Sequence, residues 1–156
     1  MKQKWKLLIL CLVAPLAVGG LSAWLSGNGM RIFSEINKPP LSPPGWLFPV
    51  VWTILYLLMG LASWLVLTSG KPQEQVGKAM RIYVLQLLVN FFWSLIFFGL
   101  ERYLFAFLWL VLLWGLIIAT MIRFYRINKT AGELLVPYFL WVTFAGYLNF
   151  TIWLLN

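Results

Sequence analysis

The chemistry open to this 156-residue chain is limited first by the side chains that it lacks. It has no histidine, one cysteine and four acidic residues. The acidic residues all lie at the ends of apolar runs or between them: Glu35, Glu74, Glu101 and Glu133. A histidine general base, a histidine metal ligand and a proximal histidine for haem are therefore missing. We expect no conventional acid–base or metal catalytic site and no acidic proton relay within the apolar runs.

Aromatic and neutral polar side chains recur at every fourth residue along three apolar segments. The first stripe is Phe48, Trp52 and Tyr56; the second is Gln86, Asn90 and Ser94, flanked by Trp93 and Phe97; the third is Pro137, Trp141, Ala145 and Asn149, with Leu148 beside it. At helical spacing, each stripe lies on one helix face. Aromatic walls with a few polar groups bind large, flat, apolar molecules. The stripes therefore predict a ligand pocket inside a bundle.

The polar stripe has a second interpretation, which is hydrogen bonding between helices. An amide surrounded by lipid needs partners, so Gln86, Asn90 and Asn149 should face the bundle interior in either case. Tryptophans near the ends of apolar runs are typical of the membrane interface. Of the tryptophans in or beside the stripes, three lie deeper than that belt: Trp52, Trp93 and Trp141. From the residues alone, ligand binding and interhelical contact both stay open.

The stripes must be positioned by helices that cross a membrane. The chain is 62% hydrophobic and only 10% charged, whereas soluble domains carry about a quarter charged residues. Its uncharged runs can each span about 30 Å of hydrocarbon, and they lack the alternation of barrel strands. We expect an all-α membrane protein, a five-transmembrane-helix bundle forming one domain over 1–156. The expected helices cover about 7–26, 45–68, 80–100, 103–125 and 133–155, with a lid loop at 27–44.

The net charge of +8 is explained by membrane topology rather than by nucleic-acid binding. Nine basic residues fall on one expected side of the membrane: Lys2, Lys4, Lys6, Lys71, Lys78, Arg81, Arg123, Arg126 and Lys129. The other side has three: Arg31, Lys38 and Arg102. This asymmetry predicts an integral protein of a cell membrane with a cytoplasmic N-terminus. Anionic lipid head groups are the expected partners of the basic side, and no nucleic acid is expected.

The connector at 27–44 ends in the proline-rich stretch KPPLSPP. Each proline fixes its own φ near about −65° and pushes the preceding residue toward extended geometry. The stretch should therefore be stiff and non-helical. Read locally, it is either a rigid turn before the next helix or the hinge of a lid over the bundle end.

Three stretches carry a family resemblance: KPPLSPPGWLFPVVWTILYLLMG, LLVNFFWSLIFFG and LLVPYFLWVTFAGYLNFTIWLLN. In this order and spacing, the sequence resembles the translocator protein (TspO/MBR) family, also called tryptophan-rich sensory proteins or peripheral benzodiazepine receptors, in its bacterial form. The resemblance implies a homodimer of five-helix bundles in which the first loop closes over a pocket. It also implies binding of protoporphyrin, haem-like tetrapyrroles and apolar benzodiazepine-type drugs.

Carried onto this chain, the resemblance implies ten ligand-binding residues: Pro43, Pro44, Trp52, Tyr56, Asn90, Trp93, Ser94, Trp141, Ala145 and Leu148. The first aromatic stripe adds Phe48 to this set. In some bacterial members, the tryptophans that match Trp52 and Trp141 are implicated in light-dependent breakdown of protoporphyrin, which would make both catalytic.

Three functions follow from this resemblance. The first is a receptor or sensor for tetrapyrroles; the others are a light-dependent porphyrin-degrading enzyme and facilitated transport of tetrapyrroles or sterol-like solutes. The tetrapyrrole would be a ligand or substrate, and no cofactor is expected. The chain departs from the family at Leu41, where many members have an aromatic residue. No Lys or Arg follows Tyr147, so the sterol motif of mitochondrial members is not supported.

Overall fold

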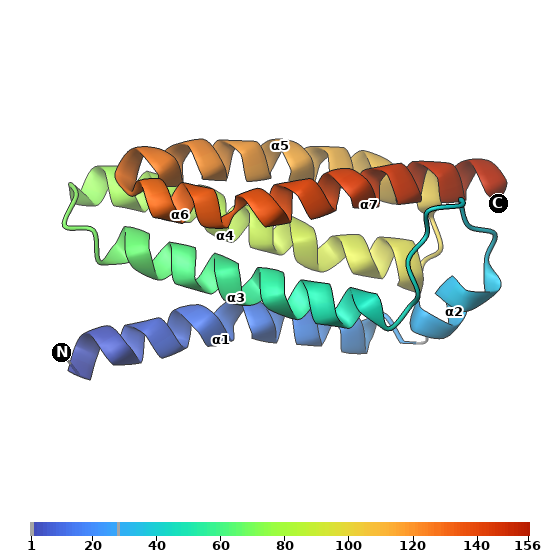
Figure 1. The fold of residues 1–156 in the computed structure, drawn as a ribbon, viewed down its shortest axis with the longest axis horizontal. Coiled ribbons are helices and arrows are strands. Elements are labelled where there is room, and N and C mark those ends of the chain that lie inside the picture. The colour runs from blue at the N-terminus through green and yellow to red at the C-terminus, as the bar shows by residue number, and fades with distance from the viewer. Residues whose placement is uncertain (1, 28) are drawn as a thin grey trace.

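The long apolar runs form helices that lie side by side in a bundle (Figure 1). This computed structural model describes residues 2–27 and 29–156. Its elements there are α1 (Lys2–Leu25), α2 (Gly29–Glu35), α3 (Leu47–Leu67), α4 (Gln73–Ser94), the π-helical turn η1 (Leu95–Gly99), α5 (Tyr103–Ile127), α6 (Lys129–Leu134) and α7 (Val136–Leu155). Five helical stretches are long and apolar enough to cross a membrane. The expected all-α, five-span architecture is thereby confirmed.

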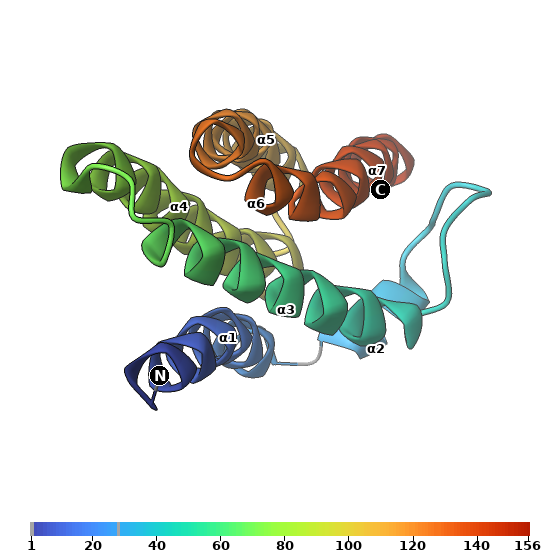
Figure 2. The ribbon, with the colours of Figure 1, turned by 60° about the vertical axis from the view of Figure 1, so that its left-hand side comes forward.

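The helix α1 lies at the edge of the bundle and packs mainly on α3 (Figure 2). Behind α3, α4 packs on α5, and α5 packs on α7. Only 17% of the apolar stretch of α1 is buried, against 28% to 44% for the other four spans. Most of α1 therefore faces outward, and its position depends on few neighbours.

Two glycines let α1 and α3 approach closely. A Cβ atom on Gly60 would meet the backbone oxygen of Cys11 and, at 2.8 Å, the Cα of Leu12. A Cβ atom on Gly19 would meet the ring of Tyr56. Small residues at a helix contact allow backbones to pack tightly in a membrane, where lipid supplies no hydrophobic drive toward association. The α1–α3 contact thus rests on the absence of two side chains.

The connector between α3 and α4 is more helical than its sequence suggests. The helix α4 begins at Gln73, whereas the apolar run predicted a start near 80. Glu74 lies in the first turn of α4, where it favours the positive end of the helix dipole. An exposed ion pair of 3.3 Å joins Glu74 to Lys78 one turn later. The apolar run marks the thickness of the membrane, and the helix continues beyond it.

The fifth span is interrupted rather than continuous. It consists of α6 and α7, which meet at Leu135. Asn128 caps α6 by accepting a hydrogen bond of 3.1 Å from the backbone N–H of Ala131. Pro137 lies in the first turn of α7, where its missing N–H costs nothing.

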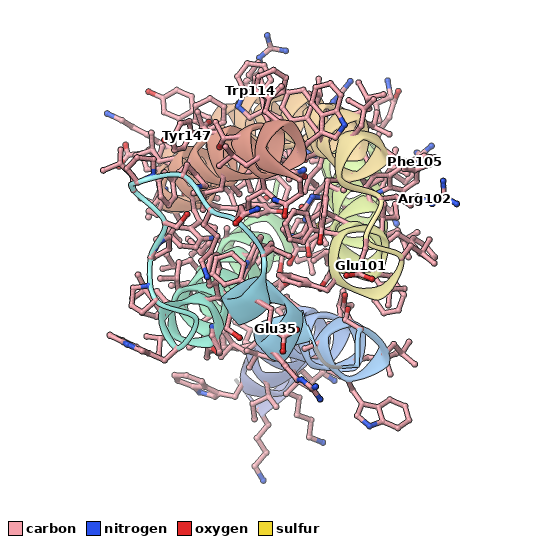
Figure 3. All side chains as sticks on the ribbon, turned by 90° about the vertical axis from the view of Figure 1, so that its right-hand side faces the viewer. Glu35, Glu101, Arg102, Phe105, Trp114 and Tyr147 are labelled. Carbon is pink, nitrogen blue, oxygen red and sulfur yellow. The ribbon has the colours of Figure 1, made fainter. Side chains whose placement is uncertain are left out.

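The connector between α1 and α3 covers one end of the bundle, which we call the lid end (Figure 3). It contains the short helix α2, which the sequence did not predict. At the same end, η1 widens the last turn of α4, and the Leu100 N–H donates to the Leu95 carbonyl at 2.9 Å. Such π-helical turns often occur at functional sites. This one buries Phe97 and Phe98 beneath α2.

Candidate ligand pocket

A cavity of about 310 Å³ lies between α1, α3 and α4 toward the lid end. Its lining residues are Leu16, Gly19, Gly20, Ser22, Ala23, Phe48, Pro49, Trp52, Thr53, Tyr56, Asn90, Trp93, Ser94 and Phe98. Most of the lining is aromatic, aliphatic or glycine. Four lining residues carry a hydroxyl group, one of them Tyr56, and Asn90 carries an amide. Its volume is at the lower end of the range of about 300–1,000 Å³ for small-molecule sites.

The wall formed by α3 consists of the predicted aromatic stripe. Phe48, Trp52 and Tyr56 all line the cavity. The Trp52 ring stacks on Tyr56 with centroids 5.5 Å apart, and it meets the Tyr138 ring edge-on at 6.2 Å. These contacts hold the Trp52 indole as a fixed face of the pocket, because offset and edge-on aromatic pairs are favourable geometries.

The amide stripe on α4 takes part in a buried chain of hydrogen bonds. The Tyr56 hydroxyl donates to Asn90 Oδ1 at 2.8 Å, and Asn90 Nδ2 donates to the Tyr138 hydroxyl at 2.8 Å. The Tyr138 hydroxyl in turn donates to Gln86 Oε1 at 2.7 Å. These hydrogen bonds join α3, α4 and α7, as the interhelical interpretation of the stripe predicted. Gln86 joins helices, whereas Asn90 does so and also lines the cavity with its second amide N–H still available.

Trp93 and Asn149 form a second interhelical contact. The Trp93 indole N–H donates to Asn149 Oδ1 at 3.1 Å, and Asn149 Nδ2 donates to the Tyr103 carbonyl at 2.8 Å. Asn149 is completely buried. Trp93 therefore offers its ring to the cavity, while its polar edge is already satisfied.

The wall formed by α1 was missed by sequence reasoning. It is made of small residues, among them Gly19, Gly20 and Ala23. Two hydroxyls fasten it to α4: Ser22 Oγ donates to the Phe91 carbonyl at 2.7 Å, and Ser26 Oγ lies 3.1 Å from Ser94 Oγ. The usable signal was the pair of adjacent glycines followed by Ala23 within an apolar run, because small residues at helical spacing leave room beside a helix.

The cavity opens on the side of the bundle. Gly20, Pro49 and Thr53 line it and are nevertheless exposed. They lie in α1 and α3, which are two of the apolar spans. The pocket is therefore accessible from the surface that the membrane covers.

The structure brings six of the predicted site residues into this cavity and leaves five outside. Trp141, Ala145 and Leu148 on α7 do not line it, and neither do Pro43 and Pro44. The Phe48 ring intervenes on the α7 side, with its centroid 5.7 Å from that of Trp141. Pro44 instead accepts a hydrogen bond of 3.0 Å from the Leu47 N–H in the turn that starts α3. The prolines position the α3 wall without touching the cavity.

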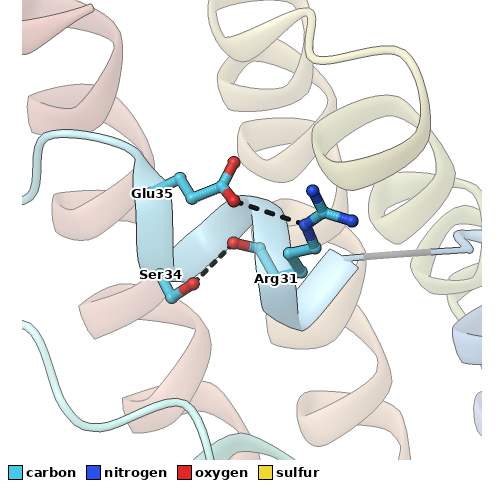
Figure 4. A network of polar contacts seen from close by, with 3 residues as sticks. All are labelled: Arg31, Ser34 and Glu35. Atoms are coloured by element: carbon cyan, nitrogen blue, oxygen red, sulfur yellow. Dashed lines mark hydrogen bonds and ion pairs between the residues drawn. The ribbon is translucent and has the colours of Figure 1, made fainter.

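The lid places an aromatic residue against two residues of the pocket wall. Phe33 is buried, with 4% of its surface exposed, and its ring lies 4.9 Å from Phe48 and 6.5 Å from Phe98. The outer face of α2 carries an ion pair of 3.3 Å between Arg31 and Glu35 and a hydrogen bond from Ser34 to the Arg31 carbonyl (Figure 4). The inner side of α2 is apolar where Phe33 lies, and the outer side is solvated.

The loop after α2 is attached to the end of α7. Asn156 Oδ1 accepts a hydrogen bond of 3.2 Å from the Asn37 N–H, and Asn156 Nδ2 donates to the Asn37 carbonyl at 2.9 Å. Asn37 Nδ2 also donates to the Leu155 carbonyl at 3.3 Å. Three hydrogen bonds thus fix the lid to α7 on the far side of the pocket from α1.

Five spanning helices around an aromatic cavity define a polytopic membrane protein with a ligand-sized pocket inside its bundle. The model of the TspO/MBR family matches residues 11–154, and the chain belongs to this family. The family resemblance carried by the proline-rich, Asn-x-x-Trp-Ser and C-terminal stretches is confirmed.

Similar proteins come from bacteria and animals. The chain is 43% identical to the tryptophan-rich protein TspO of Chlorobaculum tepidum over 150 residues, which cover 96% of this chain and 95% of that protein. It is 36% identical to the tryptophan-rich sensory protein of Cereibacter sphaeroides over 156 residues, covering 100% and 95%. It is 35% identical to the human translocator protein over 133 residues, covering 85% and 79%. The family is one of integral membrane sensors and translocators.

Proposed function

We propose that this protein is a membrane receptor that binds tetrapyrroles, with protoporphyrin as the representative ligand, and other flat apolar molecules such as benzodiazepines. The observation that carries the proposal is the cavity between α1, α3 and α4, whose walls include the rings of Phe48, Trp52 and Trp93. Stacking on such rings favours flat π-systems by about 0.5–1.5 kcal/mol per pair beyond the burial of area.

The polar groups of the cavity are suited to orienting a ligand rather than to reacting with it. Asn90 offers its remaining amide N–H, and the Ser94 hydroxyl offers lone pairs beyond its contact with Ser26. Each is held in place by a neighbour, so little side-chain entropy is lost when a ligand binds. We expect these two residues to select the orientation of the ligand, while the aromatic rings supply most of the affinity.

Light-dependent breakdown of protoporphyrin is a second candidate function, because Trp52 lies in the cavity wall. Trp52 would then meet the substrate directly. Trp141 would act through Phe48, which lies between it and the cavity.

The basic residues at the opposite end from the lid favour an orientation with that end in the cytoplasm.

A titration with protoporphyrin tests the proposal. Purified protein in lipid nanodiscs is titrated in the dark, and the dissociation constant is taken from quenching of tryptophan fluorescence. Trp52→Ala should raise the dissociation constant about tenfold, since losing one stacking wall removes about 1.4 kcal/mol. Trp52→Phe, which keeps an aromatic wall, should stay within about threefold.

The matched control is Trp114→Ala, because Trp114 lies on the outer side of the α5–α7 pair (Figure 3), where it donates to Thr143, and does not line the cavity. It should leave the dissociation constant unchanged. Quenching that never saturates, and that is equal in all four proteins, would show partitioning into lipid and refute the proposal. Repeating the titration under light addresses the second function, which is excluded if Trp52→Phe forms product as fast as the parent.

A further inference from the structure

The lid bears on the size of ligand that the pocket accepts, which goes beyond the proposed receptor function and rests on it. We propose that Phe33 is an aromatic plug, held by Lys38, that limits the volume of the pocket. Small flat ligands fit with the plug in place. A carboxylate-bearing ligand as large as a tetrapyrrole is accommodated when it takes Lys38 and displaces Phe33.

The size of the cavity is the first step. At about 310 Å³, it matches the smallest of ordinary ligand sites. A compound of a few joined rings can occupy such a space. A macrocycle of four pyrroles with two propionate arms is larger. To be enclosed by the protein rather than protrude through the lateral opening, it needs additional volume from a wall that can move.

Phe33 occupies the place from which that volume can come. It contacts both Phe48 on α3 and Phe98 on η1, and both of these line the cavity. Its ring is edge-on to Phe48, with an interplanar angle of 73°. Phe33 thus acts as a wedge between two walls that belong to different helices.

The space beyond Phe48 leads to the α7 face at Trp141. The Phe48 ring contacts both Phe33 and Trp141, with centroid distances of 4.9 Å and 5.7 Å. Without Phe33, the Phe48 side chain can turn to another staggered rotamer and open the cavity toward Trp141. The indole N–H of Trp141 is buried and has no hydrogen-bond partner among the described residues. A buried donor of this kind is costly, and a ligand acceptor would satisfy it.

Lys38 supplies the hold on Phe33. Its ammonium donates to the Phe33 carbonyl at 2.8 Å and lies 4.8 Å from the centroid of the Phe33 ring. This combines a charged hydrogen bond with a cation–π contact. In the part of the chain described by the structure, Lys38 has no carboxylate partner within ion-pair distance. A ligand carboxylate would bind the ammonium more strongly than a backbone carbonyl does.

The plug can move without releasing the rest of the lid. Asn37 is fixed to α7 by its hydrogen bonds with Asn156. The rigid proline stretch that follows holds the start of α3. Movement is therefore confined to α2, whose outer surface is already solvated at Arg31 and Glu35.

Phe33→Ala tests the plug, with protoporphyrin as the large probe and diazepam as the small one. Protein in nanodiscs is mixed with each probe in a stopped-flow instrument, and association rates and dissociation constants are measured. Removing the plug should speed protoporphyrin association about tenfold, since the fraction of receptive protein rises. Diazepam should change by less than about twofold.

The matched control is Phe105→Ala, which truncates an aromatic residue at the same end of the bundle. Phe105 is 56% exposed on the outside of α5 (Figure 3). Equal protoporphyrin rates in the parent, Phe33→Ala and Phe105→Ala would overturn the plug and leave the receptor function standing. Weaker binding of both probes in Phe33→Ala would identify Phe33 as a ligand contact and would also overturn it. If protoporphyrin saturates none of the three proteins, the receptor function and the plug fall together.

Lys38→Met tests the hold on Phe33. The parent should bind protoporphyrin about fivefold more tightly than its dimethyl ester, because only the free acid can take the ammonium. Lys38→Met should bind the two equally, whereas Lys71→Met, at the opposite end of the bundle, should keep the preference of the parent. A preference that survives Lys38→Met would show that the carboxylate is recognised elsewhere.

Discussion

The two sides of the α3–α4 pair differ in how they are filled. Toward α1 they leave a cavity of about 310 Å³, whereas toward α7 they are joined by the buried hydrogen bonds of Asn90 and Tyr138. The same two helices face both sides. The difference comes from the third helix, because α1 contributes Gly19 and Gly20 to the contact and α7 contributes Tyr138 and Trp141. A pocket in this bundle is thus defined as much by what one helix lacks as by the residues that line it.

The largest expected effect comes from breaking the close α1–α3 contact on the open side. In Gly60→Ala the new methyl group would meet the backbone of α1 at Cys11 and Leu12. Backbone cannot yield as a flexible side chain can, so unfolding in detergent should be easier by about 1–3 kcal/mol. Thermal unfolding followed by circular dichroism measures this change.

Gly115→Ala is the matched control for that substitution. It also places a methyl group within a spanning helix, but no atom lies within 4 Å of the new Cβ. Its stability should be unchanged or higher by up to about 1 kcal/mol, because alanine favours helix more than glycine does. A similar loss of stability in both variants would mean that α1 and α3 are not held by close backbone contact.

A smaller effect is expected when the open side is filled instead of broken. Gly20 lines the cavity, and a Cβ there meets nothing within 4 Å. Gly20→Leu should therefore fold normally and weaken protoporphyrin binding about fivefold by occupying cavity space, which corresponds to about 1 kcal/mol. The same fluorescence titration measures it, with Gly115→Leu as the control. Unchanged affinity in Gly20→Leu would show that the ligand does not use the α1 wall.

The smallest effect is expected on the filled side. Tyr138→Phe removes the hydroxyl that links Asn90 to Gln86. Interhelical hydrogen bonds in membranes are worth about 0.6 kcal/mol on average, so the melting temperature should fall slightly and protoporphyrin affinity should stay within about twofold. A greater loss of affinity than of stability would place Tyr138 in contact with the ligand, contrary to the separation of the two sides.

The number of spans followed from the uncharged runs, because lipid imposes its thickness on sequence. Helix ends did not follow, since α4 continues through the polar residues from Gln73 onward. The aromatic wall of α3 was predicted because its members recur at helical spacing. The α1 wall was not, because Gly19 and Gly20 carry no side chain whose type indicates a pocket. The exclusion of Trp141 depends on where the Phe48 ring lies, which spacing alone does not specify.

The lateral opening beside Gly20 and Thr53 affects how affinity must be expressed for this protein. A flat apolar molecule dissolves mainly in the bilayer, and through this opening it can reach the cavity without returning to water. The concentration that governs occupancy is then moles of ligand per volume of lipid. Dissociation constants stated per litre of buffer should rise as more lipid is added at fixed protein, whereas the same data stated as mole fractions in the bilayer should coincide.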